Sequence, residues 1–201
     1  MGGRNSFNSK LDSVFSLPPV YDESYYGMVI HEIREMQITN TGQYAHGNQP
    51  VQHMIYLYNY SGQPWKTQNR LRQIMDKLYS SAPDGYCGDE DNGQTSTWFV
   101  FSALGFYPVC PGTQQYVIGS PLFDRVELKL ENGNSFVIRA QNNGSGKPYL
   151  QSVKLNGQDH GRTWISHQEI TDGGKLEFSM GDIPDKTWGT DLESAPFSMS
   201  K

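Results

Sequence analysis

The fold class is decided by residues 126–138, which read Val126-Glu127-Leu128-Lys129-Leu130-Glu131-Asn132-Gly133-Asn134-Ser135-Phe136-Val137-Ile138. Apolar and polar side chains alternate over the first five residues, which is the period of a strand with one buried face. Asn132-Gly133 is a hairpin signal, because both residues tolerate the positive φ of a tight turn. The stretch therefore predicts two antiparallel strands joined by a turn.

The regions on either side of this hairpin differ in their periodicity. Towards the C-terminus, further strands with turn signals around them are expected near 150–155, 163–165 and 175–178. Towards the N-terminus, helical spacing connects Leu71, Ile74, Met75 and Leu78. Helices are expected at about 6–16, 23–38, 50–61, 65–81 and 93–105, with Asp22 as the cap of the second and Pro64 at the start of the fourth.

The character of the sequence changes near residue 112. We therefore expect an α+β fold with a helical part at 1–112 and a β-rich, antiparallel, sandwich-like part at 113–201.

Charge, apolar content and cysteines argue against some kinds of partner. The 201 residues carry a net charge of −5 and no cluster of Lys or Arg, which argues against nucleic acid as a partner. No apolar stretch has the length of a membrane span, and residues 1–5 lack the pattern of a signal peptide. Cys87 and Cys110 could form a disulfide or remain free thiols, and without a CxxC pair they do not predict a zinc site.

Three consecutive acids, Asp89, Glu90 and Asp91, stand in a polar turn with glycines on both sides. Adjacent carboxylates repel one another, so such a cluster persists most easily against a cation, a proton donor or sugar hydroxyls. The simpler interpretation is a solvated loop that starts a helix. An EF-hand is excluded, because the glycine stands at the fifth place and no Glu stands at the twelfth. Calcium held by several loops together remains open.

A second polar cluster lies at residues 44–53, which read Tyr44-Ala45-His46-Gly47-Asn48-Gln49-Pro50-Val51-Gln52-His53. Amides and imidazoles beside aromatic rings suit sugar hydroxyls, because each hydroxyl both donates and accepts a hydrogen bond. The simpler interpretation is a capped helix start, with His53 on the polar face and the nearby aromatic residues in the core.

Carboxylates in an aromatic-rich helical scaffold indicate glycoside hydrolysis, which needs an acid and a second carboxylate. An inverting enzyme separates the two by ~6.5–9.5 Å to admit a water. Asp89 and Asp91 share one turn, so they could hold and deprotonate one water but could not flank both faces of a sugar. The proton donor must come from elsewhere. The acids in ordinary helical contexts are not expected to supply it: Asp22, Glu23, Glu32 and Glu35.

Several motifs together resemble glycoside hydrolase family 92. The resemblance is carried by Gly85-Tyr86-Cys87-Gly88-Asp89-Glu90-Asp91-Asn92-Gly93-Gln94, by Ser102-Ala103-Leu104-Gly105-Phe106-Tyr107-Pro108, by Tyr56-Leu57-Tyr58-Asn59-Tyr60, by Gly62-Gln63-Pro64-Trp65-Lys66-Thr67 and by Gly119-Ser120-Pro121-Leu122-Phe123. The match extends over essentially the whole chain. Members of this family are calcium-dependent exo-acting α-mannosidases, chiefly α-1,2-mannosidases, that invert configuration.

The resemblance implies the last helices of an (α/α)6 barrel followed by C-terminal strands. It implies that Asp89 and Asp91 act on the water, one of them as general base, and we expect Asp91 to be the base and Asp89 its helper. We further expect Asn48, Gln49, His53 and Trp98 to contact substrate, and Asn48 and Gln49 also to bind calcium. The substrate would be an N-glycan or mannan, and the protein would be secreted, periplasmic or on the cell surface. The general acid, a glutamate, and an N-terminal domain would lie upstream of this chain, so the chain alone is expected to be inactive.

One departure from the family pattern concerns Gln49, where many members carry Glu. The loss of this charge affects the expected linkage preference and metal affinity but not the base motif. Two other classes of function remain open at this point, namely a non-catalytic carbohydrate-binding module and an inactive structural fragment. Mannose binding without turnover would support the first, and an absence of any sugar or calcium effect on melting would support the second.

Overall fold

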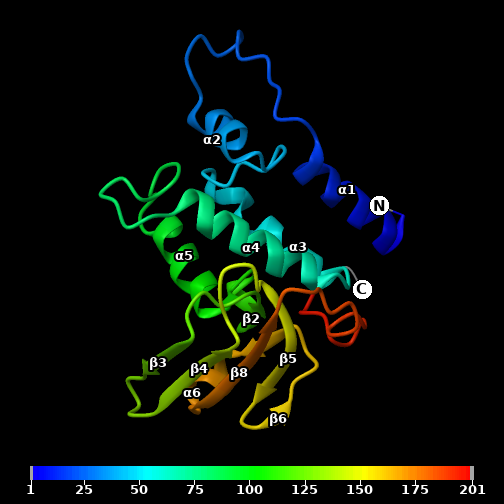
Figure 1. Ribbon diagram of the computed structural model, residues 1–201, viewed down its shortest axis with the longest axis vertical. Coiled ribbons are helices and arrows are strands. Elements are labelled where there is room, and N and C mark those ends of the chain that lie inside the picture. Colours follow the sequence, from blue (N-terminus) through cyan, green and yellow to red (C-terminus); the bar gives the residue numbers. More distant parts are fainter. Residues whose placement is uncertain (1, 200–201) are drawn as a thin grey trace. The chain divides into compact units, whose positions relative to one another are not determined.

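The computed structural model describes residues 2–199 and combines helices with two β-sheets (Figure 1). The chain forms two compact units. Unit 1 comprises Met1–Met54 and Gln73–Phe99, and unit 2 comprises Ile55–Arg72 and Val100–Lys201. The mixed α and β content agrees with the predicted fold class.

Unit 1 contains the helices α1 (Gly3–Ser16) and α2 (His31–Thr39), together with the last residues of α4 (Pro64–Leu78) and the first residues of α5 (Gln94–Leu104). Helix α1 buries Leu11 and Phe15, and the ring of Phe15 lies 4.9 Å from that of Tyr44. The helix expected at about 6–16 is thus present, and these two side chains lie on its buried face. Helix α4 begins at Pro64, as the sequence predicted.

The second predicted helix is shorter than expected. The prediction of 23–38 is wrong at its start, because residues 17–30 form a long loop and α2 begins only at His31. Gly27 has a φ of 66° and interrupts any helix there. Asp22 does not cap a helix either, because its Oδ1 accepts the backbone N–H of Ser24 at 3.0 Å in a local turn.

The third predicted helix is only partly an α-helix. Residues Gln49–Tyr56 form a 3-10 helix, and α3 covers only Leu57–Tyr60. The 3-10 helix is preceded by a turn in which Asn48 N–H donates to Ala45 O at 2.9 Å.

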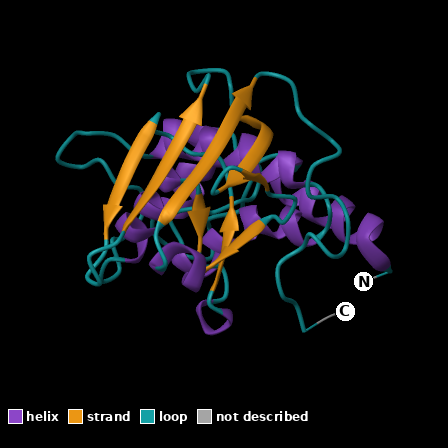
Figure 2. Ribbon diagram, turned by 90° about the horizontal axis from the view of Figure 1, so that it is seen from below, coloured by secondary structure: helices purple, strands orange, loops and turns teal. Residues whose placement is uncertain are grey.

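Unit 2 contains both sheets, which Figure 2 shows as two separate groups of strands. The first has the order β1-β2-β7, and the second has the order β3-β4-β8-β5-β6. Their bounds are β1 Phe106–Tyr107, β2 Gln115–Ile118, β3 Arg125–Lys129, β4 Ser135–Gln141, β5 Tyr149–Leu155, β6 Gln158–Asp159, β7 Trp164–Ser166 and β8 Gly174–Gly181.

The opening hairpin is confirmed. Strands β3 and β4 pair antiparallel, Val126 faces Ile138, and Gly133 at the turn has a φ of 85°. The expectation of a wholly antiparallel unit is wrong for one pair, because β4 and β8 run parallel. Alternation of apolar residues predicts which face of a strand is buried but not which strand lies beside it. The chain between β4 and β8 passes through β5, β6, β7 and the short helix α6 (His167–Thr171), which is long enough to allow parallel pairing.

The core of unit 2 lies on the faces of these strands that carry alternating apolar residues. Its buried members include Phe106, Ile118, Phe136, Ile138, Leu150, Val153, Ile165, Leu176 and Phe178. Strand β4 buries Phe136, Ile138 and Ala140, whereas Val137 between them is half-buried and Arg139 is exposed.

Candidate active site

The acidic turn lies in unit 1, between α4 and α5. Asp91 and Asn92 both have left-handed backbone conformations, with φ of 49° and 57°, and Gly93 follows with a φ of 96°. Left-handed conformations cost energy for residues other than glycine and occur preferentially at functional sites. The turn reverses the chain so that α5 begins directly at Gln94.

The middle acid of the turn has a structural role. The carboxylate of Glu90 accepts the backbone N–H groups of Gly93 and of Ser96, the latter at 3.1 Å. A hydrogen bond with the side chain of Ser96 is the main reason why the pKa of Glu90 lies below its usual range, and the bonds from the backbone N–H groups of Gly93 and Ser96 lower it further. Glu90 therefore satisfies free N–H groups at the start of α5 as a helix cap does.

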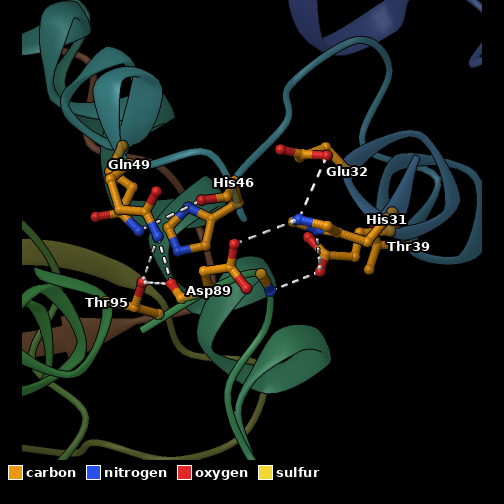
Figure 3. Close-up of polar contacts among 10 residues, drawn as sticks. His31, Glu32, Thr39, His46, Gln49, Asp89 and Thr95 are labelled. Carbon is orange, nitrogen blue, oxygen red and sulfur yellow. Dashed lines mark hydrogen bonds and ion pairs between the residues drawn. The ribbon is translucent and has the colours of Figure 1, made fainter. Parts of the chain in front are cut away.

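The two aspartates of the turn keep their carboxylates accessible. The Asp89 side chain is 80% exposed, and its Oδ2 lies 3.9 Å from Nε2 of His31 (Figure 3). Asp91 is exposed as well. Both carboxylates can thus reach a ligand or a water from solvent.

Gln49 holds the backbone of the turn. Its Nε2 donates to the carbonyl oxygen of Asp89 and to Oγ1 of Thr95, the latter at 3.1 Å, and Thr95 Oγ1 donates to the same carbonyl at 2.8 Å (Figure 3). A glutamate at this position has no N–H and could not make these bonds. The side-chain amide of Gln49 therefore holds the acidic turn in place.

The other residues expected at the site differ in exposure. Asn48 and His53 are exposed and can meet a ligand. Trp98 is fully buried, with its ring 4.2 Å from that of His46 and stacked on Tyr79 at 5.8 Å. A ring without an exposed face cannot stack on a sugar, so the expected substrate contact of Trp98 is not met in this structure, and Trp98 serves as core.

The buried imidazole of His46 connects the parts of unit 1. Its Nδ1 lies 2.7 Å from the hydroxyl of Tyr44, and its Nε2 lies 2.8 Å from that of Tyr79. Burial lowers the pKa of His46 to about 3, so the ring is neutral at physiological pH. A neutral imidazole donates through one nitrogen and accepts through the other, which matches its two tyrosine partners.

Sequence reasoning missed the contribution of α2. His31 lies within 3.5 Å of Glu32 and 3.6 Å of Glu35, and Glu35 Oε1 accepts the N–H of Gly88 at 2.6 Å. The i,i+4 spacing of His31 and Glu35 was a usable signal that both lie on one helix face. That this face meets the acidic turn follows only from the tertiary structure.

Asn48 and Gln49 do not form a calcium site by themselves. Asn48 and Gln49 offer at most two amide oxygens, whereas calcium takes six to eight oxygen ligands. Within residues 2–199, no group of three or more His, Cys, Asp or Glu side chains is arranged to hold a metal.

Both cysteines are free thiols, Cys87 buried and Cys110 exposed. None of the helices in the same range combines the length and apolar character needed to cross a membrane.

Comparisons with known proteins place this chain among glycosidases. The glycosyl hydrolase family 92 catalytic domain matches residues 1–182. A family GH92 inverting mannosidase of Bacteroides thetaiotaomicron VPI-5482 is 56% identical over 100% of this chain, with a TM-score of 0.85, and the chain covers 27% of it. A GH92 α-mannosidase of the same species, solved in complex with mannoimidazole, is 32% identical over 98% of this chain and 25% of its own, with a TM-score of 0.87.

A curated relative, an uncharacterized secreted glycosidase of Arthroderma benhamiae, is 28% identical over 99% of this chain and 23% of its own length. The chain thus spans about a quarter of the length of the relatives that it matches.

Proposed function

The chain belongs to glycosyl hydrolase family 92, and from this premise we propose that it is part of an inverting mannosidase that releases mannose from α-linked mannosides. The observation that carries the proposal is the acidic turn with its two accessible aspartates, in a chain 56% identical to an inverting mannosidase. In this proposal residues 1–112 are the helical part of an (α/α)6 catalytic barrel. Residues 113–201 are the β-rich, sandwich-like region that follows it.

Asp91 is the proposed general base and Asp89 its helper. In an inverting reaction the base deprotonates a water that attacks the anomeric carbon from the face opposite the leaving group. Exposure of both carboxylates and the left-handed backbone at Asp91 support this role. Asn48, His53 and the remaining amide oxygen of Gln49 are the proposed contacts to sugar hydroxyls.

The second half of the catalytic pair is proposed to lie outside this chain. Asp89 and Asp91 share one turn, so neither can protonate the leaving oxygen while the other activates a water on the opposite face. In this proposal a glutamate from another part of a longer polypeptide supplies the proton, and the isolated chain does not hydrolyse mannosides. The proposed substrate is an α-1,2-linked mannoside of an N-glycan or mannan, and the proposed location is secreted, periplasmic or at the cell surface.

Calcium dependence is part of the proposal because of the family, and no step is assigned to the ion, because Asn48 and Gln49 alone offer too few oxygen ligands. If calcium does bind in the full-length polypeptide, further oxygen ligands must come from other segments or from the sugar.

The test is the substitution Asp91→Asn in the full-length polypeptide, assayed on α-1,2-mannobiose. Loss of the base should lower kcat by about 10²–10⁴-fold, because an amide cannot take the proton of the water. Asp84→Asn, an exposed acid upstream of the turn, serves as the matched control and should keep wild-type turnover. Proton NMR of the first product should show β-mannose if configuration is inverted.

Full turnover by Asp91→Asn would exclude Asp91 as the base. Binding of mannose by the wild-type polypeptide without any turnover would favour a carbohydrate-binding module instead.

A further inference from the structure

Glu35 reaches from helix α2 to the acidic turn. Its side chain is 19% exposed, and its Oε1 accepts the N–H of Gly88 at 2.6 Å while lying 3.6 Å from Nδ1 of His31. The other ring nitrogen of His31 lies 3.9 Å from the Asp89 carboxylate. Glu35 therefore contacts the backbone just before Asp89 and also the imidazole that lies beside the Asp89 carboxylate.

The carboxylate of Glu35 lies where the segments that contain Gly47 and Gly88 come into close contact. A Cβ added to Gly47 would lie 2.1 Å from Glu35 Oε2, and one added to Gly88 would lie 2.2 Å from the carbonyl oxygen of Gly47. Real Cβ atoms do not approach other atoms so closely. The fit of Glu35 between the two segments thus depends on both glycines.

Glu35 is held in this place at a cost in stability. Its Oε2 is buried and has no hydrogen-bond partner within the described part of the chain. Burying a carboxylate oxygen without a donor is unfavourable, and such an atom in a folded protein calls for an explanation.

The Glu35 bond completes the fixation of the backbone around Asp89. The N–H of Gly88 is bound by Glu35, and the carbonyl of Asp89 is bound by Gln49 and Thr95. The direction of the Asp89 side chain depends on the backbone torsions between these two fixed groups. Loss of either bond frees the carboxylate to point elsewhere.

We propose that Glu35 is a positioning residue of the acidic turn, which holds Asp89 in its working orientation through the amide of Gly88. The proposal rests on the proposed function of this turn. Glu35 transfers no proton in it and touches no reacting atom.

The test uses Glu35→Gln, which keeps an acceptor but loses the charge, and Glu35→Met, which keeps the length but has no strong acceptor. Glu23→Gln is the matched control, because its side chain is 21% exposed in the same unit and its ion pair is with Arg34 at 3.7 Å. Amide NMR of the full-length polypeptide reports on the bond directly. The Gly88 amide proton should move upfield and exchange faster with solvent, by roughly tenfold in Glu35→Gln and more in Glu35→Met.

The functional readout is turnover of the full-length polypeptide. We expect kcat to fall about tenfold in Glu35→Gln and about 10²-fold in Glu35→Met, with KM changed by less than about twofold, because misplacement of a reacting group acts on the chemical step. The melting temperature of Glu35→Gln should stay near that of the wild type, because the substitution also removes a buried charge with an unpaired oxygen.

The outcomes separate this proposal from the function on which it rests. An unchanged Gly88 amide in Glu35→Met would overturn the role of Glu35, whatever the activity. A changed amide with unchanged kcat, or a loss of kcat matched by an equal loss in Glu23→Gln, would overturn it too. If the wild-type polypeptide hydrolyses no mannoside, the proposed function fails, while the NMR result still decides whether Glu35 fixes the turn.

Discussion

The stability of unit 1 should fall in mild acid because of His46. In the folded protein burial lowers the pKa of this imidazole from 6.5 to about 3. The neutral ring therefore contributes stability that is fully present above pH 6.5 and is lost as the pH falls towards 3. Each pKa unit corresponds to about 1.4 kcal/mol, so the whole shift amounts to roughly 5 kcal/mol.

The part of this energy lost between pH 7 and pH 5 is about 2 kcal/mol, because the unfolded chain takes up the proton that the folded chain refuses. The perturbation is His46→Gln, whose amide can still donate to one tyrosine hydroxyl and accept from the other. Urea unfolding at pH 7 and pH 5, followed by circular dichroism and fluorescence, gives the free energy of unfolding of both proteins.

The wild type should lose about 2 kcal/mol more than His46→Gln over this pH range. His53→Gln, at an exposed histidine of the same unit, should behave like the wild type. If the wild type and His46→Gln lose the same free energy between pH 7 and pH 5, the imidazole accepts a proton without cost, and the reasoning from its burial is wrong.

Two further substitutions test the packing of each unit. Gly88→Ala should destabilise unit 1 by about 1–3 kcal/mol, because residue 88 has a φ of 60° and its new Cβ would meet the backbone of Gly47; a thermal melt within error of the wild type would contradict this. Phe178→Ala should cost about 3–5 kcal/mol, because the ring is 1% exposed in the core of unit 2. Urea unfolding measures that loss, and a value below about 1 kcal/mol would mean that the strand is poorly packed.

Local sequence predicted the helices and strands correctly wherever apolar residues recurred at one regular spacing. The stripe at Leu71 and Ile74 gave α4, and the alternation around Asn132-Gly133 gave the hairpin of β3 and β4. The same reasoning failed at residues 23–30, where apolar residues are frequent but Gly27 takes a left-handed conformation. A pattern of apolar residues shows which side chains can be buried but not whether the backbone continues as a helix.

For the acids of the turn at 89–91, too, sequence and tertiary structure each supplied part of the answer. Sequence by itself identified the acidic turn and, through the family motifs, singled out Asp89 and Asp91. Only the tertiary structure showed that Glu90 caps α5, that Gln49 binds the backbone of Asp89, and that Glu35 reaches Gly88 from another helix. Residues 35 and 88 lie 53 positions apart. Motifs record residue types along the chain, whereas hydrogen bonds between distant segments depend on how those segments pack.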